Sequence, residues 1–437
     1  MTVKGRTYPT TPTNTNSGNT GGANLQFGTS AISAVVVAAV ASGIASLIYL
    51  MVMRRYPKQL IKVTFWISFV YFLLVGIAAI VLVRNIVLGV IFLVFAVFYA
   101  LAYRWYKTRI PFAAVVLSTV TGVTQKYPGT VWVAVCGLLV NLAFSAWWIV
   151  TVVACTLVYG ETTTRTASGG QKVSPLMYPV WVFLMFSMYW TSQVIQNTVH
   201  VTISGVFASY YFMAGSQQGM PSNPTMGALK RATTTSFGSI CYGSLLIAII
   251  RTLKAIMKQA QQNTDSAAAQ FVACCLQCLL GCVEGLLEFF NHYAFVQCAI
   301  YGKDYCRAAK DTWTLIKDRG IDLIINDSMV DRVLGYGALL VAGVSTLIAW
   351  GVYAAGNAAA GTVSTAGVDV TMIIVLIAAA AIGFVIMSLV GTVIDSGVAS
   401  TFVCLAEDPA ALKATKPELW EKIRETYPSA AFISMYA

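Results

Sequence analysis

Charged residues are scarce in this chain. Asp, Glu, Lys and Arg make up 10% of its 437 residues, whereas 57% are hydrophobic. An average soluble protein is about 25% charged, and about 20 consecutive apolar residues are enough to cross a bilayer. So little charge cannot cover the surface of a water-soluble globule of this size. The composition therefore excludes a soluble protein and predicts an integral membrane protein.

Motifs of nucleotide-driven or hydrolytic chemistry are missing as well. The sequence has no GxxxxGK[ST] phosphate loop, no HExxH, no GxSxG in a strand context, and only two histidines, His200 and His292. We therefore expect neither an ATP-driven pump nor an enzyme, and no cofactor. No basic run is interleaved with aromatic residues, so the net charge of +11 does not indicate a nucleic-acid partner. It first suggests loops that face an anionic cytoplasmic leaflet.

Ten cysteines lie mostly inside apolar runs, so a disulfide framework is not expected. Four of them, Cys274, Cys275, Cys278 and Cys282, repeat at helical spacing. No histidine accompanies them, and Cys in such surroundings behaves as a small hydrophobic residue. We favour packing inside the helix bundle for this cluster, with palmitoylation or a metal site as the alternatives.

Apolar runs separated by charged residues or by Pro and Gly predict an all-α fold with about ten transmembrane helices. We place them at residues 29–53, 63–83, 85–104, 109–125, 129–159, 178–214, 235–257, 270–300, 331–354 and 369–399. The run 178–214 could hold two spans, but nothing interrupts it after Pro179, so we interpret it as one long, tilted or locally broken helix.

Three further segments complete the predicted organisation. Residues 1–28 are rich in Thr, Asn, Gly and Pro and predict a disordered tail. The polytopic domain then covers 29–404 and includes a mixed-charge segment, 301–331, that suits a helix lying at the membrane interface. Residues 405–437 form a short charged tail. An even number of spans puts both termini on one side, but the Lys and Arg bias is too weak to decide which side.

The predicted helix 178–214 carries a stripe of polar and aromatic residues at steps of three and four, which places them on one face. They are Trp190, Gln193, Asn197, His200, Ser204, Ala208 and Tyr211, with Tyr189 and Tyr210 beside them. We interpret this face as one wall of a substrate path. The alternative is that these side chains join packed helices by hydrogen bonds worth about 0.6 to 2 kcal/mol each.

The predicted helix 270–300 repeats this pattern with Gln277, Gly281, Glu284, Glu288 and Asn291. Two carboxylates one turn apart repel each other, so either one of them is protonated or both face a wet cavity that attracts cations. A salt bridge to Arg251 is the structural alternative. Together with the aromatic faces, the carboxylates favour an organic cation such as choline, which aromatic rings hold at about 0.5 to 2 kcal/mol per face, over a metal ion.

Several sequence blocks resemble the choline transporter-like family. They are Trp190-Thr191-Ser192-Gln193 continuing to Tyr210-Tyr211-Phe212, Phe290-Asn291-His292-Tyr293-Ala294 with Ala299-Ile300-Tyr301-Gly302-Lys303 and Ala308-Ala309-Lys310-Asp311, Asp395 with Cys404-Leu405-Ala406-Glu407-Asp408, the 274–278 cysteine cluster, and Gly238 to Gly243. The resemblance implies ten helices, cytoplasmic termini, a cytoplasmic segment 301–331, and choline or a related amine as substrate.

The chain is more similar to shorter fungal and protist members, because the first loop, Arg54 to Lys62, lacks a long extracellular insertion. The implied topology puts this basic loop outside, against the positive-inside tendency.

The sequence thus predicts a plasma-membrane solute carrier for choline or a related organic cation, facilitative, driven by the membrane potential and working by alternating access. We expect the cation to lie against Trp190, Tyr210 and Tyr211, its hydroxyl at Gln193 and Asn197, and its charge neutralised by Glu284 or Glu288, with Asn291 on the same face. The alternatives are ethanolamine or another solute as cargo, or a membrane scaffold that transports nothing. The sequence leaves the oligomeric state open.

Overall fold

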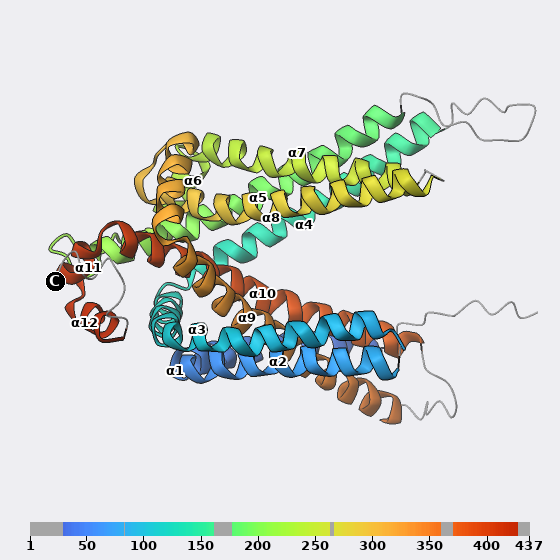
Figure 1. Ribbon diagram of the computed structural model, residues 1–437, viewed down its shortest axis with the longest axis horizontal. Helices are drawn as coiled ribbons and strands as arrows, with labels where there is room; N and C mark the ends of the chain where they lie inside the picture. Colours follow the sequence, from blue (N-terminus) through green and yellow to red (C-terminus); the bar gives the residue numbers. More distant parts are fainter. Residues whose placement is uncertain (1–28, 83, 161–176, 263–265, 360–369, 427–437) are drawn as a thin grey trace, which may run out of the picture.

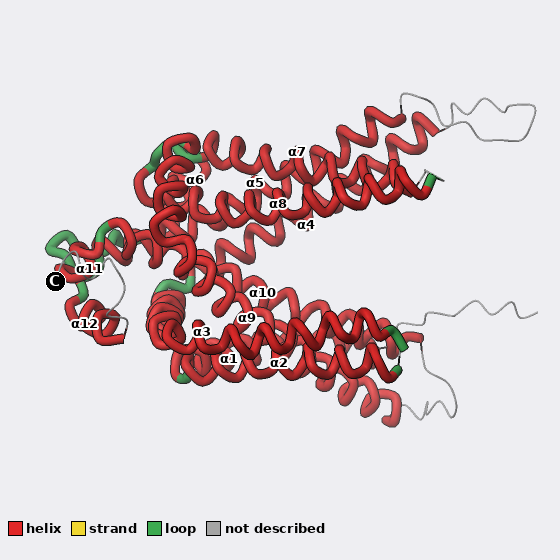
Figure 2. Tube along the Cα trace, in the orientation of Figure 1, coloured by secondary structure: helices red, strands yellow, loops and turns green. Residues whose placement is uncertain are grey.

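A computed structural model describes residues 29–82, 84–160, 177–262, 266–359 and 370–426 (Figure 1). Within these residues all regular structure is helical, and no strand occurs (Figure 2). The helices are α1 (Thr29–Arg55), α2 (Pro57–Val81), α3 (Ile86–Lys126), α4 (Gly129–Gly160), α5 (Met177–Met213), α6 (Pro224–Thr233), α7 (Phe237–Gln262), α8 (Ala267–Tyr301), α9 (Tyr305–Ala359), α10 (Val370–Glu407), α11 (Pro409–Thr415) and α12 (Pro417–Thr426). The predicted tail 1–28 lies outside the described residues.

Eight of these helices contain a segment long and apolar enough to cross a membrane: α1, α2, α3, α4, α7, α8, α9 and α10. In α3 that segment is Ile86–Arg104, and in α9 it is Ser328–Ala359. Helix α5 has sufficient length, at 37 residues, and carries the predicted polar face. The all-α, multi-pass fold class is therefore confirmed, and residues 177–213 form one helix, as expected.

One predicted boundary is wrong. The helices expected at 85–104 and 109–125 are one helix, α3, with Pro111 in its interior. A proline removes one backbone hydrogen bond and bends a helix without having to end it, and Figure 1 shows the second half of α3 turning away from the line of the first. The segment 301–331 lies mostly in the first half of α9, which runs for 55 residues and of which only Ser328–Ala359 is apolar enough to cross a membrane, so its place at the interface stays a prediction.

The long helices form two groups that meet at one end (Figure 1). One group contains α4, α5, α7 and α8, and the other contains α1, α2, α9, α10 and the first half of α3. Small residues allow close packing in the second group, where Ala34, Ala38 and Ala379 are fully buried. We call the end where the groups meet, next to α6, α11 and α12, the joined end; at the other end the groups diverge.

The chain passes between these two ends an odd number of times. A hydrogen bond from Ser30 Oγ to Asn357 Oδ1 (3.0 Å) links the start of α1 to the last turns of α9, at the diverging end. Arg54 Nη1 donates to Gln125 Oε1 (2.6 Å), so the end of α1 meets the end of α3 at the joined end. In the described helices α1 therefore begins at the diverging end and α10 finishes at the joined end, whereas the number of membrane spans stays a prediction.

Most basic residues of the described chain lie at the joined end. The loop between α1 and α2 lies there, together with the ends of α3 and α5, the start of α9, and α6, α11 and α12 (Figure 1). These segments carry Arg54, Arg55, Lys58, Lys62, Lys126, Lys230, Arg231, Lys303, Arg307, Lys310, Lys413, Lys416, Lys422 and Arg424. The basic first loop thus lies on the same side as the start of α9 rather than opposite to it.

The core of the protein lies towards the joined end. Side chains are continuously buried from His200 to Ala208 in α5, from Tyr293 to Cys298 in α8 and from Ser396 to Ser400 in α10. Before these points the same helices have partly exposed faces. All three helices therefore become enclosed at one common level, which we call the junction level.

Candidate substrate site

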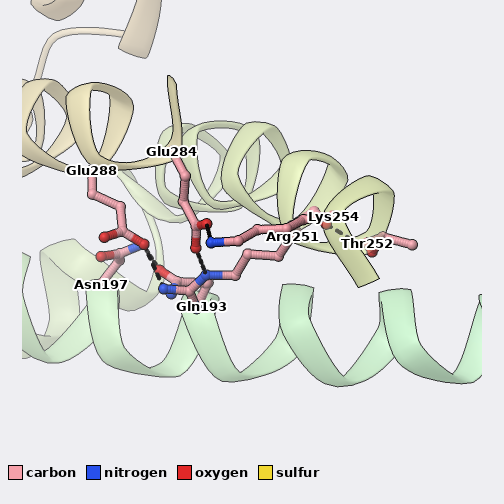
Figure 3. A network of polar contacts seen from close by, with 8 residues as sticks. Gln193, Asn197, Arg251, Thr252, Lys254, Glu284 and Glu288 are labelled. Atoms are coloured by element: carbon pink, nitrogen blue, oxygen red, sulfur yellow. Dashed lines mark hydrogen bonds and ion pairs between the residues drawn. The ribbon is translucent and has the colours of Figure 1, made fainter. Parts of the chain in front are cut away.

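A charged network joins α7 to α8 inside the first helix group (Figure 3). Arg251 Nε donates to Glu284 Oε1 at 2.8 Å, and Arg251 Nη2 donates to Glu288 Oε1 at 2.5 Å. Lys254 Nζ donates to Glu284 Oε2 at 2.8 Å. Because the two carboxylates meet two cations, the charges of the network cancel. The salt bridge to Arg251, considered from the sequence as the alternative for both glutamates, is confirmed.

Helix α5 contributes polar side chains to the same network. The Gln193 amide has its oxygen towards Arg251, where it accepts from Nη1 at 2.6 Å, and Gln193 is only 6% exposed. Asn197, one turn further, donates from Nδ2 to Ser244 Oγ on α7 at 2.9 Å. Four predicted site residues, Gln193, Asn197, Glu284 and Glu288, therefore come together around Arg251. We call them, with Arg251 and Lys254, the Arg251 network.

Two further predicted residues bond to the backbone of α7. Trp190 Nε1 donates to the carbonyl of Cys241 at 3.1 Å. Asn291 Nδ2 donates to the carbonyl of Gly243 at 3.0 Å, and Tyr305 OH donates to Asn291 Oδ1. Asn291 is 1% exposed, so its contacts are those of a side chain that joins helices.

Tyr210 and Tyr211 lie apart from the Arg251 network, at the joined end. Tyr211 OH donates to the carbonyl of Asp408 at 2.9 Å. Lys416 Nζ donates to the carbonyls of Tyr210 (2.8 Å) and Tyr211 (3.0 Å) and lies 4.5 Å from the centre of the Tyr210 ring. Burial lowers the pKa of Lys416 to about 8. The five predicted site residues on α5 are thus divided between two places along that helix.

A histidine pair lies at the junction level, between the Arg251 network and these tyrosines. The rings of His200 on α5 and His292 on α8 stack with their centres 4.2 Å apart. His200 Nε2 donates to the His292 carbonyl at 2.9 Å, and His200 Nδ1 lies 2.8 Å from Ser396 Oγ on α10. His292 Nε2 lies 3.7 Å from Asp395 Oδ2.

The sequence patterns do not bring these residues together. They place His200 on the polar face of the predicted helix 178–214 and Asp395 near the end of the predicted helix 369–399. His292 follows Glu288 by one further step of four, so extending the α8 stripe by one turn would have found it.

A large apolar cavity, about 1010 Å³, lies elsewhere, between α4, α5 and α6. Trp132, Phe144 and Val194 are among its lining residues, and the only charged residue in the lining is Lys126. None of the eight predicted residues lines this cavity. A cavity with a basic residue and no carboxylate does not suit an organic cation.

The four cysteines of the 274–282 cluster are exposed on α8. The expectation that they pack inside the bundle is wrong, because α8 turns this face outwards. In the described part of the chain no three His, Cys, Asp or Glu residues lie close enough to hold a metal ion.

Comparison with known proteins decides the family. The family model described as plasma-membrane choline transporter matches residues 90–410. The chain belongs to this family. It is 36% identical to Protein PNS1 of Mycosarcoma maydis, over 97% of this chain and 79% of that protein. It is 37% identical to Protein PNS1 of Gibberella zeae, over 88% and 71%, and 36% identical to Protein pns1 of Aspergillus fumigatus, over 87% and 71%.

Membership of the plasma-membrane choline transporter family confirms the predicted resemblance and agrees with the eight candidate spans. The protein is a multi-pass membrane protein of a transporter family. The Arg251 network, the histidine pair and Asp395 all lie within the matched residues.

Proposed function

We propose that this protein carries choline or a closely related organic cation across the plasma membrane by alternating access. Family membership supports a transporter. The observation that carries the proposal is a continuous line of polar side chains inside the membrane domain, on α5 from Gln193 to His200 and on α8 from Glu284 to His292. Polar residues at such depth are costly unless they serve a path, a ligand or one another.

The distribution of basic residues supports an orientation with the joined end in the cytoplasm. Cytoplasmic loops carry an excess of Lys and Arg, and the loop between α1 and α2, α6, α11 and α12 all lie at the joined end. The C-terminal helices are then cytoplasmic, as the family resemblance implied. The first loop no longer conflicts with the positive-inside tendency, because α3 is one helix and the number of passes is odd.

The described conformation is then closed on the inside. Below the junction level α5, α8 and α10 are enclosed by protein. Where α3, α5 and α10 meet α11 and α12, only about 20 Å³ of cavity remains, next to Tyr210, Tyr211 and Lys416. Transport requires this inner side to open and the diverging end to close. Tyr210 and Tyr211 therefore act as part of the inner closure rather than as the first contact for a cation from outside.

The Arg251 network has a different part in the proposal. Its glutamates already have cationic partners, so we assign Glu284 and Glu288 to holding Arg251 in place, and Gln193 and Asn197 to contacts with the hydroxyl of a choline-like substrate. Exchange of either glutamate for Gln then reduces uptake because it leaves Arg251 partly uncompensated.

Uptake of labelled choline by proteoliposomes tests the function. An inside-negative potential favours entry of a monovalent cation by about 2.3 kcal/mol per 100 mV, close to 50-fold accumulation. We expect uptake to follow the imposed potential without ATP or sodium. Unlabelled choline should compete with labelled choline, and the degree of competition by ethanolamine shows how far the carrier accepts other amines. Vesicles with protein that take up no more of any tested amine than empty vesicles would refute the proposal.

A further inference from the structure

Asp395 has no fixed positive partner at the junction level. Among the described residues no Lys or Arg lies within salt-bridge distance of its carboxylate, and it makes no hydrogen bond. We propose that Asp395, together with His292, binds the positively charged head of the transported cation. This inference rests on the proposed function and names the counter-charge at its binding site.

Asp395 and His292 lie next to each other without a hydrogen bond between them. Oδ2 of Asp395 and Nε2 of His292 face each other at 3.7 Å, too far for a hydrogen bond. His292 Nε2 is buried and has no other partner in the described chain. Buried polar atoms are nearly always bonded, so this pair is unusual in the interior of the protein. No bond therefore has to be broken when a cation approaches the Asp395 carboxylate.

The charges around Asp395 distinguish it from the two glutamates. Glu284 and Glu288 are matched by Arg251 and Lys254. Asp395 instead faces His200 and His292, and the next acidic group that it senses is Asp331 on α9. Arg332 lies beside Asp331, so the charge left without a partner is that of Asp395 itself, which an organic ammonium ion neutralises.

Aromatic and polar groups beside Asp395 complement such a head group. The stacked rings of His200 and His292 provide a flat face, and the Tyr293 ring stands edge-on to His292 at 5.5 Å. A quaternary ammonium ion donates no hydrogen bond, so it needs π faces and a nearby carboxylate rather than acceptors in a fixed geometry. The site therefore suits a methylated amine.

Asp395 lies at the last partly exposed position of α10 before the buried residues of the junction level. Its side chain is 33% exposed and that of His292 is 23% exposed, whereas Ser396 and the following residues of α10 are buried. Glu288, one turn before His292, is 40% exposed. A cation that moves inwards along α8 thus reaches Asp395 where the path ends.

The position of the pair explains how binding acts on the transporter. His292 belongs to α8 in one helix group, and Asp395 belongs to α10 in the other (Figure 1). A cation that lies against both side chains contacts a residue from each group, so its binding energy can change how the two groups lie relative to each other. A carboxylate within a single group has no such effect.

The test compares Asp395→Asn, which keeps the shape and removes the charge, with the wild type in proteoliposomes. Asp311→Asn, which removes a carboxylate paired with Lys303 at the joined end, is the matched control. We expect Asp395→Asn to raise the KM for choline at least tenfold and Asp311→Asn to change it less than twofold. Thermal unfolding in detergent checks that each variant is folded.

An uncharged choline analogue separates a charge contact from a structural effect. We expect wild-type protein to bind choline far more strongly than 3,3-dimethyl-1-butanol, and Asp395→Asn to lose this preference while retaining its affinity for the alcohol. Equal loss of both ligands, or unchanged choline affinity, overturns the inference. If Asp395→Asn does not fold, choline should protect Thr392→Cys, an exposed position one turn before Asp395, from a charged thiol reagent. The absence of protection then overturns the inference.

These outcomes are distinct from failure of the proposed function. If wild-type protein neither binds nor transports any amine, the proposed function itself fails. If wild-type protein transports choline and Asp395→Asn does so equally well, only the assignment of Asp395 fails.

Discussion

Removal of Arg251 should destabilise the first helix group strongly. Arg251→Met keeps the apolar stem and removes the guanidinium, so Glu288 loses the only ion pair that it has among the described residues, and Glu284 keeps Lys254 alone. The Gln193 amide also loses its partner. We expect the protein to fold with a weakened contact between α5, α7 and α8.

The magnitude follows from the exposure of the partners. Breaking a buried ion pair by removal of one partner costs about 3–5 kcal/mol, whereas an exposed pair is worth about 0–1 kcal/mol. Glu284 is 14% exposed and belongs near the first class; Glu288 is 40% exposed and belongs near the second. Because Lys254 still holds Glu284, we expect a loss of about 2–3 kcal/mol, between these limits.

Thermal unfolding of the purified protein, followed by intrinsic fluorescence, measures this loss. Arg251→Met should lower Tm clearly, while Lys258→Met, which removes an exposed basic residue two turns further along α7, should not. The double variant with Glu288→Gln should recover part of the loss, because it removes the carboxylate left without a cation. An unchanged Tm in Arg251→Met, or a double variant less stable than the single one, would refute the role assigned to the network.

Three further predictions concern the joined end. Lys416 has a pKa of about 8 in the folded protein and an ordinary value of 10.5, so between these pH values the folded state binds fewer protons than the unfolded state. The stability of the wild type, measured as Tm, should therefore rise with pH across this range, and that of Lys416→Met should not. Gly397→Val should prevent stable expression, because a Cβ atom there would lie 2.6 Å from the Phe207 ring and 2.7 Å from Val120. Lys58→Cys should react with an impermeant thiol reagent only in permeabilised cells, because the loop between α1 and α2 is cytoplasmic in the proposed orientation. Labelling of this cysteine in intact cells would show that the proposed orientation is inverted.

Most helices could be predicted from the sequence because the features that define a membrane span are local. Apolar length and the breaks between runs identified the spans, and the uninterrupted run 178–214 indicated one helix. Residues 104–111 misled the prediction for a physical reason. Two arginines and Pro111 resemble a loop between spans, but the turns after Pro111 are buried against other helices, with Leu117 and Val120 fully enclosed. Tertiary packing thus sustains a helix that the local pattern would end.

The site was predicted in part for a similar reason. Steps of three and four place Gln193 with Asn197 and Glu284 with Glu288 correctly, because that geometry belongs to a single helix. The stacking of His200 on His292 depends on the axial register of two helices 92 residues apart in sequence. No local pattern specifies this register. The separation of Tyr211 from Gln193 was implicit in helix length, since 18 residues of helix span about 27 Å.

The same helices connect the junction level to the inner closure. In α5, Tyr211 follows His200 by 11 residues, and in α10, Asp408 follows Asp395 by 13. Because Tyr211 OH is bonded to the carbonyl of Asp408, α5 and α10 are tied to each other about 16–20 Å beyond the histidine pair. A rotation of one helix group against the other changes the distance between His292 and Asp395. The same rotation strains the bond between Tyr211 and Asp408 and the contacts of Lys416 with the end of α5. In the proposed alternating-access cycle, opening of the inner side therefore requires α11 and α12 to release α5. We expect substrate binding and docking of the C-terminal helices to be coupled through α5 and α10.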